Sequence, residues 1–156
     1  MRSEPLHAGK DQGGRARVRA HRVCYRSMRL TVTPTGPALL IRSYAEGSLR
    51  VGDATWKSPV LLASSGLQRA LRPQSPAELE ERDLEPVFTE KPELVVIGWA
   101  VGQTFLPAAQ RRWFLERQIG LEIMELGAAC RTYNVLIGDG RRVVALLFPN
   151  STPART

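Results

Sequence analysis

The stretch that decides the fold reads Pro92-Glu-Leu-Val-Val-Ile-Gly-Trp-Ala-Val-Gly102. Residues 94–97 form a continuous apolar run, which is typical of a parallel strand buried on both faces. A glycine-framed loop follows this run, and residues 107–119 then show a helical pattern. A strand, a loop and a helix in this order predict an α/β domain.

The same alternation continues toward the end of the chain. We predict a strand over 121–124, a helix over 128–137, a turn at Gly138-Asp-Gly140 and a last strand over 142–148. In the helix predicted over 107–119, Ala108, Leu115 and Ile119 share one stripe, and Gly120 is placed to end the helix. Strand, helix, strand, helix, strand is a βαβ-type arrangement.

The N-terminal half favours antiparallel strands. Apolar segments over 29–32 and 38–44 precede two runs, 48–51 and 54–62, that flank Gly52-Asp53 as in a tight hairpin. Pro59 lacks an N–H group, so we expect its strand to be an edge or to carry a bulge. A polar connection over 73–91 holds a helical turn, which Ser75 caps and Pro86 ends or kinks. The predicted fold class is α/β (α+β layered): one domain with a mixed sheet, two main helices and an N-terminal antiparallel hairpin layer.

The net charge of +7 is concentrated near the N-terminus. Residues 1–27 hold seven Lys or Arg residues against two acidic ones, whereas residues 28–156 hold 15 basic and 13 acidic residues. The near-neutral balance of the second part argues against a nucleic-acid partner. We interpret 1–27 as a disordered basic leader, 28–150 as the domain and 151–156 as a flexible tail. A mitochondrial presequence fits the leader in part, because such segments are rich in Arg.

The residues available for chemistry are few. The only histidines, His7 and His21, lie in the leader, so the predicted domain has no imidazole for a catalytic triad, a Cys-His pair or a histidine-bound metal. The spacing of Cys24 and Cys130 indicates neither a disulfide framework nor a metal site. This favours a reducing compartment, and we predict the cytoplasm. No apolar run approaches the ~20 residues of a membrane-spanning helix. We therefore predict no enzymatic activity, no metal and no cofactor.

A candidate crevice for a ligand or partner lies where the strand of 94–97 ends, because open α/β sheets bind ligands at the carboxyl ends of their strands. Its members, including the start of the second helix, are Gly98, Trp99, Gly102, Cys130, Arg131, Thr132 and Asn134. The two glycines either admit an anion or permit the backbone angles of a turn. Cys130, in the first turn beside Arg131, is either a thiol of lowered pKa or a small buried residue. Asn134 either faces the crevice or bonds a loop.

Two aromatic residues of the first helix, Trp113 and Phe114, lie off its predicted apolar stripe. They either form an exposed contact patch or are covered by the N-terminal strands. Arg111, Arg112 and Arg117 on the same helix are expected to form a solvated face.

Four segments carry a resemblance to a known family: Leu94-Val-Val-Ile-Gly98, Gly120-Leu-Glu-Ile-Met124, Ala128-Ala-Cys-Arg-Thr-Tyr-Asn-Val-Leu136 and Gly140-Arg-Arg-Val-Val-Ala-Leu-Leu-Phe-Pro149. They resemble the domain-of-unknown-function 498 (Mth938-like) family, which includes the mitochondrial respiratory complex I assembly factor 3. The resemblance covers about residues 28–149 and implies a compact layered domain with no established enzymatic activity. In eukaryotic relatives, it implies scaffolding of complex I assembly.

The chain departs from the family pattern in two places. The family's loop usually reads Gly-Thr-Gly, whereas Trp99 here adds bulk where a backbone cradle needs clearance. The second helix usually follows Asp-Thr or a similar cap, whereas Glu125-Leu-Gly127 predicts weaker capping. We expect a non-catalytic binding or assembly module with a protein partner. The alternative is a small-molecule or anion binder, or an enzyme, that uses Cys130 and Arg131 in the Gly98–Gly102 crevice.

Overall fold

The computed structural model of the chain describes residues 40–45, 47–100 and 106–150. These ranges form two sheets, three α-helices and two short 3-10 helices. A three-stranded antiparallel sheet contains β1 (Ile41–Ala45), β2 (Ser48–Val51) and β3 (Ala54–Trp56). A five-stranded mixed sheet, in the order β5-β4-β8-β6-β7, contains β4 (Val60–Ala63), β5 (Gln68–Ala70), β6 (Leu94–Trp99), β7 (Gly120–Glu125) and β8 (Val143–Phe148). The helices are η1 (Pro76–Glu78), η2 (Glu81–Leu84), α2 (Glu85–Thr89), α3 (Ala108–Leu115) and α4 (Leu126–Gly138).

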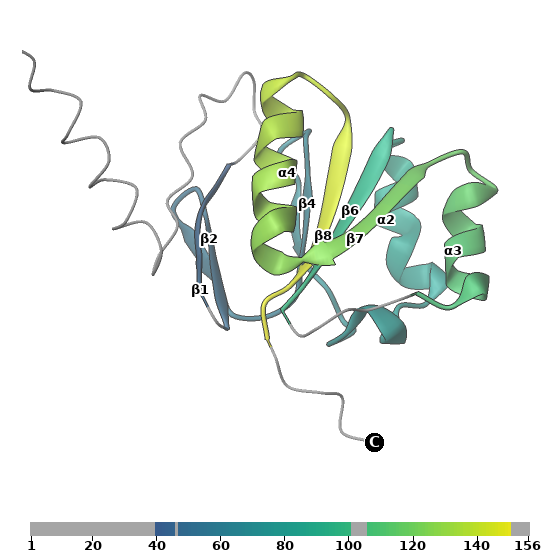
Figure 1. Cartoon of the computed structure of the whole chain (residues 1–156), viewed down its shortest axis with the longest axis horizontal. Helices are drawn as coiled ribbons and strands as arrows, with labels where there is room; N and C mark the ends of the chain where they lie inside the picture. Colours follow the sequence, from purple (N-terminus) through teal and green to yellow (C-terminus); the bar gives the residue numbers. More distant parts are fainter. Residues whose placement is uncertain (1–39, 46, 101–105, 151–156) are drawn as a thin grey trace, which may run out of the picture.

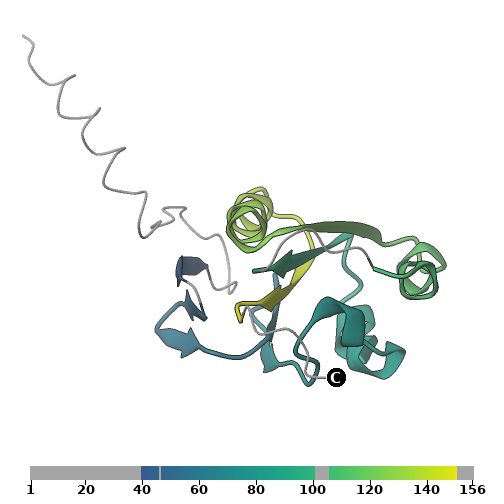
Figure 2. The same cartoon turned by 60° about the horizontal axis from the view of Figure 1, so that its bottom comes forward.

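The five-stranded sheet separates two apolar clusters, and α4 and α2 lie on its opposite sides (Figures 1 and 2). On the α4 side, Val96 of β6 packs with Ala129 of α4 and with residues of the small sheet. On the other side, Val95 and Ile97 pack with Val87 of α2 and with α3. Alternate residues of one strand therefore serve two cores, as the period of a strand requires. The predicted layered α/β fold is confirmed.

The C-terminal half follows the predicted βαβ pattern. Strand β6 pairs in parallel with both β7 and β8, and all the residues of β6 except Leu94 are buried. The predicted strands over 121–124 and 142–148 and the predicted helix over 128–137 correspond to β7, β8 and α4. The predicted strand over 29–32 lies outside the described residues.

The arm predicted over 54–62 is two strands in different sheets. Strand β3 pairs with β2 across the Gly52-Asp53 turn, as predicted, whereas β4 pairs with β5 and β8. Pro59 lies between β3 and β4, and its carbonyl accepts a hydrogen bond from the Leu71 N–H. The expectation of an edge strand therefore holds for β3 only, because the chain changes sheets at Pro59 and β4 is an inner strand.

Helix α3 is shorter than predicted and buries a different face. Gln118 adopts a left-handed conformation, with φ of 57°, and the Ile119 N–H bonds to the Phe114 carbonyl. Together with the bond from the Gln118 N–H to the Leu115 carbonyl, this is a Schellman ending. Gly120 therefore does not end the helix but begins β7. The stripe was also wrong, because Leu115 is 77% exposed.

In the connection before β6, Ser75 and Pro86 lie at helix starts, but neither has its predicted role. Ser75 occupies the N-cap of η1, but its side chain makes no capping hydrogen bond. Pro86 lies in the first turn of α2, where its missing N–H is not needed, so it helps to start a helix and does not end one. None of the helices in the described ranges is long and apolar enough to cross a membrane.

Candidate functional site

Gly98, in the predicted crevice, is a packing residue of β6. A Cβ built there would lie 2.6 Å from the Ala129 Cβ and 2.9 Å from the Leu147 Cδ2. Its φ is not positive, so the missing side chain serves the close approach of α4 to the sheet, not the backbone angles of a turn. Gly102 lies outside the described residues. At Gly98, the predicted crevice is therefore filled by the helix.

Trp99, the last residue of β6, points to the other side of the sheet. It is buried, and its ring contacts Phe148 in an edge-on arrangement with the ring centroids 6.0 Å apart. Because neighbouring strand residues face opposite sides, its bulk lies away from the space between Gly98 and α4. The expectation that Trp99 obstructs a cradle at Gly98 is therefore wrong.

Cys130 is a buried core residue in the second turn of α4. Burial raises the pKa of its thiol to about 12; the charge of Glu125 adds to this, and the charge of Arg131 opposes it. The structure thus contradicts the hypothesis of a thiol with a lowered pKa and bears out the alternative of a small buried residue. The charge of Arg131 lowers the pKa of the thiol by less than the loss of solvent around the sulfur raises it.

We expect the Cys130 thiol to make the protein less stable at alkaline pH. A thiol in an unfolded chain ionises near pH 8.5, whereas Cys130 in the fold ionises at about 12. The stability that the neutral thiol contributes is fully present below about pH 8.5 and falls as the pH rises, because the unfolded state loses its proton first. The loss approaches about 1.4 kcal/mol per pH unit.

Urea unfolding of the wild type and of Cys130→Ala, at about pH 7.5 and about pH 9.5, measures this effect. The variant should be less stable at both pH values but should lose less stability between them. Burial also raises the pKa of Tyr133, but an unfolded tyrosine ionises only near pH 10, above the tested window. Equal losses in the two proteins would contradict the assignment.

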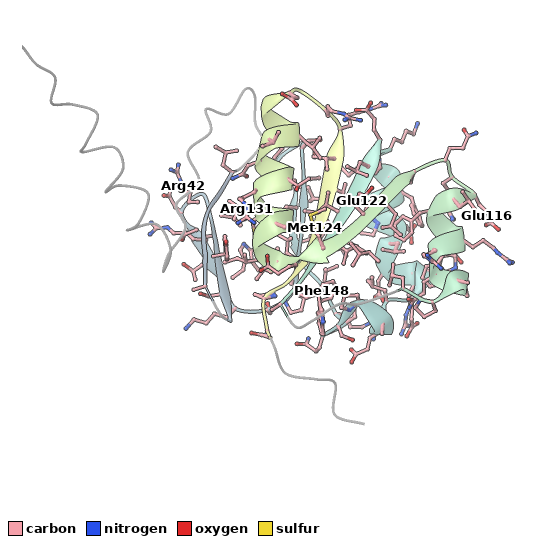
Figure 3. The ribbon with its side chains drawn as sticks, in the orientation of Figure 1. Arg42, Glu116, Glu122, Met124, Arg131 and Phe148 are labelled. Carbon is pink, nitrogen blue, oxygen red and sulfur yellow. The ribbon has the colours of Figure 1, made fainter. Side chains whose placement is uncertain are left out.

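Arg131, Thr132 and Asn134 attach α4 to its neighbours. The Arg131 Nη1 donates to the Tyr44 hydroxyl of β1 at 3.0 Å, and Arg131 lies on the side of α4 that faces β1 (Figure 3). The Thr132 hydroxyl lies 3.4 Å from the Met124 sulfur. The Asn134 amide accepts from the Ile41 N–H at 3.0 Å and donates to the Ile41 carbonyl at 2.8 Å. Asn134 is buried, so it neither faces a crevice nor bonds a loop but closes the edge of a strand.

Glu125 gives α4 a better start than predicted. Its carboxylate accepts hydrogen bonds from the Gly127 N–H at 2.8 Å and from the Ala128 N–H at 3.0 Å. A negative charge at this position also complements the helix dipole. The prediction of weak capping is wrong because glutamate here supplies the bonds that Asp, Ser or Thr usually supplies.

Trp113 and Phe114 belong to the core on the α2 side. Phe114 is buried and meets Phe88 edge-on, with the ring centroids 6.0 Å apart. Trp113 is half-buried against the same cluster. Burial, the second alternative, therefore describes Phe114, although the cover comes from the α2 segment and not from the N-terminal strands.

The arginines of this helix differ in their surroundings. Arg111 and Arg112 are exposed, as expected. Arg117 instead lies 3.9 Å over the Phe88 ring and pairs with Glu81 at 3.0 Å. It therefore ties the turn after α3 to η2 and α2, and it is not part of a purely solvated face.

A groove that the sequence did not reveal lies between β5 and α2. It encloses about 520 Å³ and is lined by Leu61, Leu67, Arg69, Ala70, Leu71, Arg72, Arg82, Asp83, Glu85, Pro86, Thr89 and Glu90. Leucines of β4 and of the residues around β5 give it an apolar side, and η2 and α2 give it a charged side. The polar connection before β6 predicts only a helical turn, and no local pattern shows that it faces a sheet edge.

An ion-pair network fixes one end of the groove. Arg72 pairs with Asp83 at 2.8 Å and with Glu80 at 3.2 Å, and Arg82 pairs with Glu80 at 2.8 Å. Burial of Asp83 opposes ionisation, but hydrogen bonds from Arg72 and from the Glu80 N–H outweigh it, so the pKa of Asp83 is lowered. The network therefore stays charged near neutral pH and holds η2 against the strand side of the groove.

No cluster of three metal-binding side chains occurs within residues 40–45, 47–100 and 106–150. The described residues of the predicted crevice are occupied by packing or by contacts within the fold. The groove is the concave surface that we consider for binding.

Comparison with known proteins shows a family profile and several solved structures that are similar to the chain. A family profile described as "Protein of unknown function (DUF498/DUF598)" matches residues 41–148. The chain is similar to a solved protein of Bordetella parapertussis, with 30% identity, a TM-score of 0.68, and coverage of 74% of this chain and 99% of the other. It is also similar to a protein of Bartonella henselae described as an outer membrane protein, with 31% identity, a TM-score of 0.65, and coverage of 76% and 100%.

A third similar structure, from Bordetella pertussis, is described as a Mth938-like domain. It shares 25% identity with the chain at a TM-score of 0.66, with coverage of 78% of this chain and 92% of the other. No functionally curated protein matches the chain. The matched span begins in β1 and ends in β8, so it contains both sheets and every described helix. The chain therefore belongs to the DUF498/DUF598 family, whose function is unknown.

Proposed function

We propose that the protein is a non-catalytic binding module that holds a partner protein at the groove between β5 and α2. The observation that carries this proposal is the position of the groove beside β5, which forms one edge of the five-stranded sheet. An edge strand offers backbone hydrogen-bonding groups that another chain can use. The burial of Cys130 supports a role without covalent chemistry, because a neutral, inaccessible thiol is a poor nucleophile.

The relationship to a family that includes a complex I assembly factor, inferred from the sequence, supports a role in the assembly of protein complexes. Such a role needs a surface that recognises a partner and no reactive group. The groove has a lining of this kind, in which Leu61 and Leu71 are buried and the three arginines and Glu85 are exposed. Interfaces of protein partners commonly have this anatomy.

Filling the groove is expected to abolish partner binding. Thr89 is exposed and lines the groove, so Thr89→Trp would place an indole in it without disturbing the core. Ala109→Trp, at an exposed position of α3 that does not line the groove, is the matched control. The tagged full chain and both variants would be isolated from native cells, and bound proteins quantified by mass spectrometry.

The expected result is a specific partner whose recovery falls at least about tenfold with Thr89→Trp, equivalent to about 1.4 kcal/mol, and is unchanged with Ala109→Trp. Thermal unfolding of the variants checks that they remain folded. Equal recovery of all proteins with the two variants would overturn the proposal.

A small-molecule ligand is a second candidate, and the volume of the groove favours it. Pockets for such ligands usually enclose about 300–1,000 Å³, and the groove encloses about 520 Å³. A metabolite that raises the melting temperature of the wild type but not of Thr89→Trp would support this candidate.

A further inference from the structure

The pairing of β5 with β4 determines which backbone groups of β5 face outward. The Ala63 N–H bonds to the Leu67 carbonyl, and the Leu71 N–H bonds to the Pro59 carbonyl. In an antiparallel ladder, residues that bond to the neighbouring strand alternate with residues whose N–H and C=O point away from it. Leu67 and Leu71 bond toward β4, and so does Arg69 between them, opposite Leu61. Gln68 and Ala70 therefore present their backbone groups to the open side.

The side chains of β5 alternate in the complementary way. Leu67 and Leu71 pack with Leu61 of β4 on the side of the sheet that faces the groove, and Arg69 lies on that side too. Ala70 also borders the groove. The Gln68 side chain lies on the other side of the sheet, where its Oε1 accepts from the Trp56 indole N–H at 3.1 Å. This contact with β3 attaches the start of β5, and the bond from the Leu71 N–H to the Pro59 carbonyl attaches its end. The edge strand is therefore held by contacts within the fold.

A strand added to this edge would extend the sheet alongside the groove. Every second side chain of such a strand would face the groove, because alternate residues share one face. Leu61, Leu67, Leu71 and Pro86 provide an apolar surface for one of these side chains. The groove-facing residues of the added strand would then lie between the sheet and α2.

The charges of the groove favour a basic side chain. Arg72 and Arg82 are already neutralised by Asp83 and Glu80. Glu85 and Glu90 line the α2 side, and neither forms an ion pair with any residue in the described ranges. Arg69, on the strand side, is the remaining cation of the lining. A lysine or arginine that crosses the groove toward α2 would meet two carboxylates.

We infer that β5 receives an extended segment of a partner protein by β-strand addition, with an apolar and a basic side chain two residues apart facing the groove. This inference rests on the proposed function and specifies the chemistry of the partner. The backbone of the segment bonds to Gln68 and Ala70, its apolar side chain packs on the leucines, and its basic side chain meets Glu85 and Glu90. Affinity comes mainly from the backbone, and selectivity comes from the alternate side chains.

The probe is a synthetic peptide, acetyl-Thr-Val-Thr-Lys-Thr-Val-Thr-amide, in which Val and Lys share one face. Titration into the isotope-labelled full chain should shift the amide signals of Gln68 and Ala70 and of the residues along α2. A matched peptide with Glu in place of Lys should bind at least about tenfold more weakly. The double variant Glu85→Lys/Glu90→Lys should reverse this preference. Equal binding of the two peptides to the wild type, or shifts confined to another surface, would overturn the inference.

A proline variant tests the backbone contact directly. Ala70→Pro removes an outward N–H that β4 does not use, and proline is tolerated at such edge positions. Thr55→Pro is the matched control on the edge strand β3, because the Val51 and Ala54 pair closes the two-residue turn and leaves the Thr55 N–H pointing outward. Peptide binding should fall at least about tenfold with Ala70→Pro and stay unchanged with Thr55→Pro.

The two proposals fail separately. Loss of the native partner with Thr89→Trp but not with Ala70→Pro would show protein binding in the groove without strand addition, which would overturn only the inference. Retention of the partner in both variants would overturn the inference and the proposed function together. A concentration-dependent dimer that Ala70→Pro abolishes would make a second copy the occupant, and this would also overturn the inference.

Discussion

Replacing Gly98 by alanine is expected to destabilise the protein by roughly 3 kcal/mol, at the upper end of typical costs for overpacking a core. The new methyl group would lie 2.6 Å from the Ala129 Cβ and 2.9 Å from the Leu147 Cδ2. Ala129 belongs to a helix and cannot rotate away, so α4 itself would have to move off the sheet. A valine at the same position would bring two further methyl groups into this contact, and we expect it not to fold.

A double variant tests this explanation. In Gly98→Ala/Ala129→Gly the methyl group is moved from the helix to the strand, which relieves the shortest contact. The glycine in α4 costs about 1 kcal/mol in helix propensity, and Ala128→Gly, next to it on the same helix, is the control for that cost. We expect the double variant to be more stable than the sum of the two single changes predicts, by about 2 kcal/mol in urea unfolding. Additive effects would show that the contact with Ala129 is not the cause.

Replacing Asn134 by alanine should cost roughly 2–4 kcal/mol, because two backbone groups lose their partners at once. The Asn134 amide bonds to both the N–H and the carbonyl of Ile41, which is completely buried. Asn134→Asp keeps the shape but places a carboxylate beside the Ile41 carbonyl, so we expect it to be at least as harmful near neutral pH. Val135→Ala, on the exposed side of the same helix, is the control.

The site of the damage distinguishes this prediction from a general loss of packing. The two hydrogen bonds between Asn134 and Ile41 form a clamp that joins the small sheet to α4. Hydrogen exchange should therefore accelerate first at the amides of β1 and β2. The amides of β6 and β8 should remain protected until the whole protein unfolds. Uniform acceleration in both sheets, or an effect of Asn134→Ala no larger than that of Val135→Ala, would contradict the role of the clamp.

The sequence was informative where one segment alone determines the structure. The apolar run of β6 predicted a strand buried on both faces, and the structure covers both faces. The hairpin at Gly52-Asp53 followed from local turn chemistry. The end of α3 was missed because Gln118, not a glycine, takes the left-handed position. Its apolar stripe was wrong because the helix buries Gln110 and Phe114 and leaves Leu115 exposed.

The candidate surfaces depended on contacts between distant segments. Asn134 and Ile41 are 93 positions apart, and no pattern around either residue indicates that they meet. The candidate crevice combined correctly located elements, but its described residues contribute to packing or to contacts within the fold. The groove combines β5 with a charged connection whose residues look solvated in isolation. Such a site becomes visible only when both walls are placed.

The clamp at Ile41 also bears on how copies of this protein behave when they are crowded together. Assemblies of misfolded chains often grow where a sheet border offers free peptide groups to a neighbour. At Ile41 the carboxamide of Asn134 already bonds to the N–H and the carbonyl of this sheet edge, so these peptide groups are not available to another copy. A small sheet can in this way stay at the periphery of a domain without recruiting further molecules at that point.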